Sequence, residues 1–483
     1  MNIKKTITTL ATLVVLSVGA YGQSSLLVNK TPTISESGTY TFFDAYNNTT
    51  PTLTVKNGGE TPTIITMTGD RGLFNGNGSQ TTIVGDTGSK IEIESSSGVV
   101  RNIREKKTSL FIDVESDAPI SLGSAAAADG YYSHLVVGGD FTINCPDITK
   151  KNNLFEIMGN STLDIGATYN NVYHAGNFTI NQAGHSKNYN FIFKAETGAA
   201  TINVNKGSSL TAAAFFLVGL SDLNVGSTVN VAGTMTATDY SRSSTAYMAS
   251  MRIGTLNILS GGKVEANTSL SSNVYIRNLS SAGEMILKHS LYIANGNNQA
   301  LITLKEGSNI KTNGASSQAE SIIYLVNREW LNGTTTQIDN NKKDAVNAKI
   351  ALEANQKLGG FRVASSSMIE IALQGKSFEL GSIEDIDGGL DFTIIINDFA
   401  NNLFSFASDS KIVTECLNGT ANINNIVLAY ANIGGVKTLL DLEWQTVGDK
   451  SFLYSQALVP EPAQWAAIFG ALALAFVAYR RRR

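Results

Sequence analysis

A short frame of strand, glycine turn and strand recurs along the sequence and limits the folds open to the chain. Copies begin at Ile202, Leu256 and Ile302. Each has two apolar residues around a polar one, a glycine three residues later, and a further apolar residue three after that. Glycine at a corner supplies the positive φ of a sharp turn. A unit this short cannot bury its own apolar face, so units are expected to stack into a continuous core.

A tighter form of the frame leads from Leu163 through Gly166 to Tyr169, and again from Leu223 through Gly226 to Val229. The copies start at irregular spacings, which predicts loops of different length leaving the stack. No proline occurs between Pro146 and Pro460. Proline has no amide hydrogen to donate, and a strand paired on both sides needs that donor. The absence of proline over this range therefore fits a continuous ladder of strands.

These patterns predict an all-β chain whose body, residues 23–345, is a right-handed parallel β-helix, or solenoid. Tandem β-sandwiches are the alternative, because short strands with turn signals fit that class as well. Residues 346–452 contain longer apolar segments at 392–396 and 426–430 and are expected to form a β-rich cap over an open ladder edge. The nearest approach to an amphipathic helix pattern, residues 343–358, is interrupted by glycines at 359 and 360.

The N-terminus has the three parts of a secretory signal peptide. Lys4 and Lys5 form a positive region, residues 10–18 are an apolar core too short to span a bilayer well, and small residues follow. Ala20 and Gly22 at positions −3 and −1 predict cleavage before Gln23, so that the signal is residues 1–22. Cleavage after Ala20 is the alternative.

The C-terminus combines a Pro-Glu-Pro motif, an apolar segment and an arginine cluster. After a tether at 453–459, Pro460, Glu461 and Pro462 open a tail, and the 18 residues 462–479 carry no charge. As a helix they cover about 27 Å, enough for a single transmembrane span. The cluster Arg480, Arg481, Arg482 and Arg483 predicts a cytoplasmic end. The rest of the chain is then expected outside that membrane.

This tail resembles the PEP-CTERM sorting signal of Gram-negative bacteria, a resemblance that covers residues 459–483 only. It implies recognition by exosortase, removal of the tail near the motif at 460–462, and a stop at 480–483. It also implies an exported protein associated with extracellular polysaccharide or biofilm matrix. The body looks similar to bacterial surface adhesins and autotransporter passenger domains, without a diagnostic motif. An uncut, permanent membrane anchor is the alternative final state.

The expected function is therefore that of an exported, non-enzymatic surface or matrix protein. Its partners would be the general secretion machinery, exosortase, the membrane before processing, and extracellular polysaccharide or O-linked glycans. The expected route leads across the inner membrane, through a transient anchor, to the cell surface or extracellular matrix. The alternatives are a secreted β-helix polysaccharide lyase or glycosidase and an anchored adhesin.

Charge argues against a nucleic-acid partner. Formal net charge is −4, and setting aside the terminal groups Lys4, Lys5, Glu461 and Arg480 to Arg483 leaves 30 basic and 39 acidic residues, or 30 − 39 = −9. An acidic body repels phosphate backbones. Cys145 and Cys416 are too far apart in sequence for a zinc site or a disulfide framework. Buried thiols are the favoured interpretation, and a long-range disulfide is the alternative.

Catalytic and metal motifs are sparse, and no cofactor is expected. The best calcium candidate is the acidic turn with Asp385, Asp387 and Asp391, which lacks the spacing of an EF-hand. An acidic turn between strands is the favoured interpretation. The histidines are scattered, at His134, His174, His185 and His289.

One group of carboxylates could serve a carbohydrate-active enzyme. These side chains alternate along a strand-like segment, with two arginines just upstream: Asp113, Glu115, Asp117, Arg101 and Arg104. Such enzymes need converging carboxylates. Acids on one face of a strand are more often its solvated side, so a structural role is favoured.

Overall fold

Parallel β-strands dominate the chain, as the short apolar segments predict. The computed structural model describes side chains at 200–212, 227–238, 251–266, 273–293, 300–326 and 344–458, and at scattered positions from 137 to 180 and from 214 to 217. Elsewhere it describes the backbone of strands only. The chain divides into unit 1, Met1–Phe216 with Ser241–Ser243, and unit 2, Leu217–Tyr240 with Ser244–Arg483.

In unit 1 the described strands belong to two parallel sheets, A and B. They alternate one by one over residues 24–122, and from residue 120 onward two strands of sheet B precede each strand of sheet A. Those of sheet A are β1 (Ser24–Leu26), β3 (Gly38–Phe42), β5 (Ile64–Met67), β7 (Lys90–Ser95), β9 (Ser109–Val114), β12 (Asp140–Cys145), β17 (Asn177–Gln182) and β20 (Ser209–Ala212). Those of sheet B are β2 (Thr33–Ile34), β4 (Thr52–Val55), β6 (Thr81–Gly85), β8 (Ile103–Lys106), β10 (Ile120–Leu122), β11 (His134–Gly138), β13 (Phe155–Ile157), β14 (Thr162–Ile165), β18 (Phe193–Lys194) and β19 (Thr201–Val204), with β21 (Phe215–Leu217) at the unit boundary. An antiparallel hairpin, β15 (Ala167–Tyr169) with β16 (Val172–His174), also belongs to this unit.

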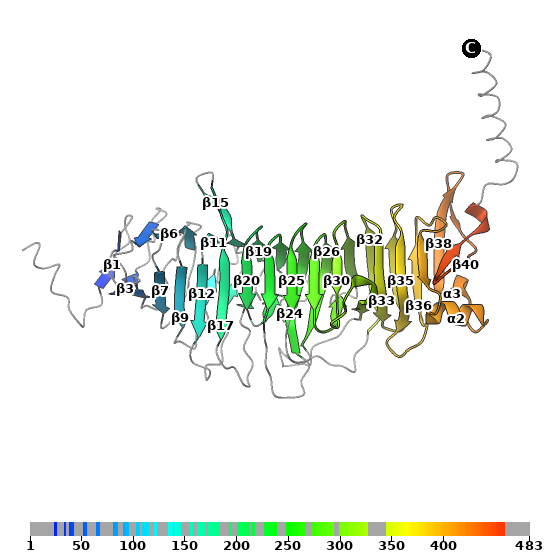
Figure 1. Cartoon of the computed structure of the whole chain (residues 1–483), viewed down its shortest axis with the longest axis horizontal. Helices are drawn as coiled ribbons and strands as arrows, with labels where there is room; N and C mark the ends of the chain where they lie inside the picture. Colours follow the sequence, from blue (N-terminus) through cyan, green and yellow to red (C-terminus); the bar gives the residue numbers. More distant parts are fainter. Residues whose placement is uncertain are drawn as a thin grey trace, which may run out of the picture. The chain divides into compact units, whose positions relative to one another are not determined.

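Unit 2 has the same alternation over its first strands (Figure 1). Sheet A contains β23 (Thr234–Ala237), β25 (Lys263–Ala266), β27 (Glu284–Leu287) and β30 (Asn309–Lys311). Sheet B contains β22 (Thr228–Val231), β24 (Met248–Ile258), β26 (Ser272–Ser281), β28 (Leu291–Ile293), β29 (Gln299–Leu304), β31 (Ile322–Leu325), β32 (Asn347–Leu352), β33 (Gln356–Val363), β34 (Ser367–Ala372), β35 (Phe378–Asp385), β36 (Phe392–Ile396), β37 (Phe404–Ala407) and β38 (Val427–Ile433).

Burial alternates along these strands because successive side chains point to opposite faces. In β25 the pattern is partly exposed at Lys263 and Glu265 and buried at Val264 and Ala266. In-register partners on β27 repeat it, since Val264 lies opposite Met285. Each strand therefore adds one layer to a common apolar core and one layer to an outer polar face.

The frame glycines occupy the corners as predicted. Gly207, Gly261 and Gly307 have φ of 74°, 78° and 84° and follow strands of sheet B. A side chain is strained at such φ values, so glycine is favoured there. The apolar residues on either side of the turn are buried, for example Ile258 before Gly261 and Val264 after it.

The segment nearest to a helical pattern, 343–358, forms strands β32 and the start of β33 instead. Glycine at 359 continues β33 rather than ending an element. A Cβ on Gly359 would lie 2.5 Å from the backbone carbon of Glu320 and 2.6 Å from the Ser321 nitrogen. Close approach of the neighbouring backbone, not a turn, explains this glycine.

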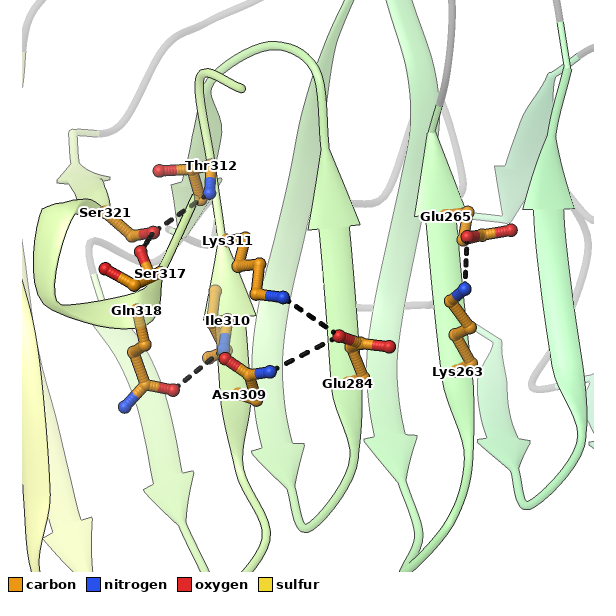
Figure 2. A network of polar contacts seen from close by, with 10 residues as sticks. All are labelled: Lys263, Glu265, Glu284, Asn309, Ile310, Lys311, Thr312, Ser317, Gln318 and Ser321. Atoms are coloured by element: carbon orange, nitrogen blue, oxygen red, sulfur yellow. Dashed lines mark hydrogen bonds and ion pairs between the residues drawn. The ribbon is translucent and has the colours of Figure 1, made fainter. Parts of the chain in front are cut away.

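A short 3₁₀ helix covers the free edge of sheet A after β30. This helix, η1 (Gln318–Glu320), puts the Gln318 side chain where a further strand would pair (Figure 2). Ile310 N donates to Gln318 Oε1 at 2.8 Å, and Thr312 N donates to Ser321 Oγ at 3.1 Å. Gln318 Nε2 donates in turn to Gln356 Oε1 at 2.9 Å, which links the edge to β33. The exposed N–H groups of an edge strand are thereby satisfied.

Antiparallel strands end the ladder at its C-terminal side. β41 (Lys450–Tyr454) pairs antiparallel with β37 and with β40 (Glu443–Val447), and β39 (Val436–Leu439) pairs antiparallel with β38. The helices α2 (Lys411–Leu417) and α3 (Ile423–Ile426) lie between β37 and β38 in sequence, and η2 (Gln456–Leu458) follows β41. The C-terminal region at 346–452 consists mainly of strands, as predicted.

The predicted terminal signals lie outside the described residues. These are the N-terminal segment with Ala20 and Gly22 and the tail 459–483. Within the described part of the chain, no helix is both long enough and apolar enough to cross a bilayer.

Candidate functional site

Two rows of polar side chains run across the outer face of sheet B in unit 2. Register places Thr228 opposite Thr255 and Asn278, and places Asn230 opposite Asn257, Ser280 and then Thr303. We call the first set the threonine row and the second set the asparagine row. All of these side chains are partly exposed. Neighbouring strands lie about 4.8 Å apart, and alternate residues along a strand about 6.6 Å apart, so the rows form a regular array.

Side chains within the rows bond to each other. Asn257 Nδ2 donates to Asn230 Oδ1 at 2.8 Å, and Asn278 Nδ2 donates to Thr255 Oγ1 at 3.3 Å. These bonds fix the orientation of the amides. An asparagine amide has two N–H donors and two acceptor lone pairs, so the bond from Asn257 to its neighbour leaves capacity for an outside ligand, whereas Asn278 Oδ1 is buried and faces no ligand. The array can therefore present ordered donors and acceptors to a polyhydroxyl surface.

Unit 1 contains a comparable pair. On β14 and β19, Asp164 lies opposite Asn203, and Asn203 Nδ2 donates to Asp164 Oδ1 at 2.7 Å. Both side chains are partly exposed, while their neighbours Leu163 and Ile202 are buried. The same frame position therefore carries the polar residue in each unit.

The outer face of sheet A in unit 2 is charged rather than neutral. Lys263 Nζ lies 2.6 Å from Glu265 Oε1 on the same strand, and Lys311 Nζ lies 3.2 Å from Glu284 Oε1 on the neighbouring strand (Figure 2). Asn309 Nδ2 also donates to Glu284 Oε1, at 3.3 Å. The hydrogen bond and charge of Glu265, outweighing partial burial, raise the pKa of Lys263 above its usual value. These charges compensate each other locally.

Other glutamates of sheet B are also close to a base. The pairs are Lys305 with Glu353 at 3.4 Å, Lys349 with Glu370 at 3.6 Å, Lys357 with Glu379 at 3.8 Å, Lys450 with Glu379 at 2.6 Å, and Arg362 with Glu384. Glycosidases need two carboxylates converging on one bond, one of them with a raised pKa. Carboxylates spaced along the ladder and paired with bases are arranged for strand cohesion instead.

The acidic turn proposed for calcium is stabilised by protein donors. Asp385 is buried, and its Oδ1 accepts from Asp387 N at 2.9 Å and Gly389 N at 2.8 Å, while Oδ2 accepts from Asp391 N at 3.2 Å. Burial acts to raise the pKa of Asp385, but these N–H bonds and the charge of Lys411 outweigh it and lower the pKa below its usual range.

Neighbouring groups also engage this turn. Asp391 Oδ2 accepts from Ser366 Oγ at 3.1 Å, and Lys411 donates to the Gly388 carbonyl. Among the residues whose side chains are described, no group of three or more His, Cys, Asp or Glu is arranged to hold a metal ion. The carboxylate at 385 acts as the central acceptor of a turn.

The sequence candidates for catalysis fall where side chains are not described. Asp113 lies on β9 and Arg104 on β8, both known as backbone only, and Arg101, Glu115 and Asp117 lie outside the described residues. The same holds for the side chains of His134, His174 and His185. His289 is described, and its carbonyl accepts from Asn313 N at 3.1 Å, in a turn.

Cys416 is a free thiol in α2. Burial raises its pKa, and the charge of Glu415 acts in the same direction. A raised pKa keeps this thiol protonated at neutral pH, which lowers its reactivity as a nucleophile. The side chain of Cys145, on β12, lies outside the described residues.

Stacked tyrosines form a third row, on the half of sheet B made by β26, β28 and β31. Tyr275, Tyr292 and Tyr324 lie opposite one another in register. The first two rings stack with centroids 5.0 Å apart at 15°, and the next pair lies 4.7 Å apart at 31°. The central ring, Tyr292, is buried with a neighbouring ring on each face, so it cannot also stack on a sugar. We assign this row to stability.

The sequence frame predicted the core but not the two polar rows as a site. A signal was present, because the residue between the two apolar positions of each frame copy is Asn203, Asn257 or Thr303. Period-two alternation sends this residue outward. Register across strands, which the sequence does not state, turns these single residues into rows.

Comparisons of the chain with protein-family models, with curated proteins and with solved structures give no match.

Proposed function

We propose that this chain is an exported, non-catalytic protein of the cell surface or extracellular matrix that holds polysaccharide on the outer face of a right-handed parallel β-helix. The polar rows of sheet B carry this proposal. They combine small uncharged donors and acceptors, a spacing set by the strands, and hydrogen bonds that fix the amides in place. A polysaccharide chain presents hydroxyl groups at regular intervals, and such an array can meet many of them at once.

The β-helix is supported by the alternation of strands between sheets. From β24 to β30, a strand of sheet B leads through a glycine-containing turn to a strand of sheet A, and the next strand of sheet B pairs in parallel with the last. Parallel neighbours need a crossover, and crossovers between parallel strands are right-handed almost without exception. Tandem sandwiches are less well supported, because sandwich sheets are built from antiparallel strands.

Export and sorting rest on the two ends of the sequence. The signal peptide at 1–22 would direct secretion, and the tail with Pro460, Glu461 and Pro462 would hold the chain in the inner membrane until exosortase removes it. Arg480 to Arg483 would stay cytoplasmic. Ser, Thr and Asn side chains of the body would then contact polysaccharide or carry O-linked glycans.

The test of binding uses extracellular polysaccharide purified from the producing cells. The protein is expected to co-sediment with it and to release no new reducing or unsaturated ends on prolonged incubation. Release of such ends by the pure protein would instead support the alternative of a β-helix lyase or glycosidase.

Sorting is tested separately, by the intact mass of the protein recovered from cells and from the extracellular fraction. The expected mature mass lacks residues 1 to about 22 and the residues after the Pro-Glu-Pro motif. A protein that keeps Arg480 to Arg483 and stays in the membrane fraction would be the anchored adhesin.

A further inference from the structure

The hairpin of β38 and β39 exposes large apolar side chains. Val436 is 64% exposed, Leu439 54% and Ile433 38%. Large exposed side chains grouped on one element mark an interaction surface more often than isolated ones do. Residues 427–439 include no acidic residue and one base, Lys437, whereas the whole chain is acidic.

Hydrogen bonds link this hairpin to the last described residues of the chain. Lys437 Nζ donates to Asn397 Oδ1 at 2.8 Å, and Phe399 N donates to the Tyr430 carbonyl at 3.0 Å, so the turn after β36 is joined to both strands of the hairpin. In the same turn, four residues after Asn397, the Asn401 side chain accepts from Ser455 N at 2.8 Å and donates to the Ser455 carbonyl at 3.1 Å. One turn thus fixes both the hairpin and the last residues before the tail. In Figure 1 the hairpin tip and η2 lie on the same side of the cap.

The linker between the last described residues and the uncharged segment is short. From Leu458 at the end of η2 to Pro462 at the start of the uncharged segment is four residues, a span of at most about 14 Å. If the uncharged segment crosses a bilayer, Leu458 lies within that distance of the membrane, and the hairpin lies on the same side of the cap as η2 (Figure 1). Exposed apolar side chains with no neighbouring anion suit such a surface, because the boundary between headgroups and acyl chains accepts apolar groups.

We infer that, while the tail is inserted, the β38–β39 hairpin docks on the lipid surface through Ile433, Val436 and Leu439. This inference rests on the proposed membrane tail. Docking would hold the cap in a defined orientation, with the Pro-Glu-Pro segment close to the bilayer surface. The contact is lost when the tail is cut, since three side chains alone bind a membrane weakly.

The experiment uses the full chain in vesicles of phosphatidylcholine and phosphatidylglycerol. A polarity-sensitive fluorophore is attached at Val436→Cys in a background with Cys145→Ser and Cys416→Ser. The matched control is Leu301→Cys on β29, which is 43% exposed and four strands, or about 19 Å, away from β38. Lipids with a headgroup-level quencher are expected to reduce emission at 436 at least about twofold more than at 301.

Vesicle flotation distinguishes a failure of the proposed membrane tail from a failure of the hairpin contact. A chain that does not float with vesicles contradicts the membrane tail and with it the proposed sorting. A chain that floats, but whose label at 436 is quenched no more than the label at 301, overturns the hairpin contact alone.

Hydrogen exchange of the natural chain repeats the test without substitutions. Amides of 433–439 are expected to exchange at least about threefold more slowly in vesicles than after the tail is removed by proteolysis, with residues 259–262 unchanged. Protection that disappears when protein is diluted relative to lipid would assign the surface to a second copy of the chain and overturn lipid docking.

Discussion

The strands from β22 to β30 and the closing segment, residues 356–455, bury their cores with different side chains. In the first region the buried residues are mainly aliphatic, such as Val229, Leu256 and Leu279, stacked on identical positions of the next strand. In the closing segment four of the six largest fully buried side chains of the described residues are Phe361, Phe378, Phe404 and Phe406. These rings meet edge to face, and the last lies 6.0 Å from Trp444.

The polar groups differ in the same way. In the repeating strands, polar side chains bond to residues near the same register position on the neighbouring strand, whereas the closing segment uses bonds that do not recur from strand to strand. Lys450 reaches Glu379, and the amides of Asn401 and Asn424 each bond both the N–H and the carbonyl of a distant residue, Ser455 and Leu442. Strands that repeat one frame are held together by the same in-register contacts at each layer. The last strands of a ladder need contacts of their own, because these contacts must cover its open edge.

The largest effect that this comparison predicts is at Phe404. Phe404→Ala removes the ring that contacts both Phe378 and Phe406, and we expect a loss of about 3–5 kcal/mol in the free energy of unfolding. Urea unfolding followed by Trp444 fluorescence measures it. The body control is Ile258→Val, with an expected loss of about 1 kcal/mol. A loss at Phe404 no greater than that of the control would show that the aromatic series adds nothing to the closing segment.

Asp385 should come next. Asp385→Ala leaves the N–H groups of Asp387, Gly389 and Asp391 without their acceptor, and we expect a loss of about 2–3 kcal/mol at neutral pH. The exposed Asp409→Ala is the control and should change little. Calcium should not alter the melting temperature of either protein, because the oxygens at 385 already accept backbone bonds. A melting temperature that calcium raises in the natural chain but not in Asp385→Ala would support a calcium site instead.

The pH dependence of this effect has a definite sign. The folded pKa of Asp385 is lowered, so the unfolded state binds the proton more readily and stability rises with pH. The contribution is complete above the unfolded pKa of about 3.9 and is lost as pH falls through the folded value. The stability gap between the natural chain and Asp385→Asn should therefore narrow below about pH 4. A gap that widens on acidification contradicts the assignment.

The Asn401 amide should matter less than the buried carboxylate. Asn401→Ala removes two bonds to Ser455, and we expect a loss of about 1–2 kcal/mol, because both bonds join uncharged groups whereas Asp385 accepts as a charged carboxylate. Hydrogen exchange should also rise in β41 before it rises in β25. Asn432→Ala, on the exposed hairpin, is the matched control. Equal effects of the two variants would mean that the amide bridge does not hold the chain exit.

The smallest stability effect is expected at the Lys450–Glu379 pair. Both side chains are about one-third exposed, so Lys450→Ala should cost about 0.5–1 kcal/mol, and less at high salt. Stability measured at low and high salt gives the electrostatic part. An effect that does not change with salt would point to lost packing of the lysine stem.

The repeating region was predictable because its rules are local. Two apolar residues around a polar one, followed by glycine, predicted the strands and corners at Ile258, Gly261 and Val264. The closing segment was predictable only as β-rich. Its antiparallel β41, which pairs with β37 from 43 or more residues away, and the edge cover formed by Gln318 depend on contacts that no short pattern encodes.

The candidate site was half visible in the sequence. The outward polar residues Asn203, Asn257 and Thr303 are part of the frame, but their alignment into rows depends on parallel register between strands whose connections vary in length. The acidic turn at 385–391 was visible as well. The backbone donors that surround Asp385 come from local geometry that composition does not reveal.

The central claim, that the sheet B rows hold polysaccharide, is tested most directly by comparing two asparagine variants. Asn257→Leu disrupts the asparagine row, and Asn309→Leu makes the same change on the charged face of sheet A. Affinity for the purified extracellular polysaccharide is measured for both and for the natural chain. We expect at least about fivefold weaker binding for Asn257→Leu, corresponding to about 1 kcal/mol, and unchanged binding for Asn309→Leu. Equal affinities for the two variants, with both chains folded, would contradict it.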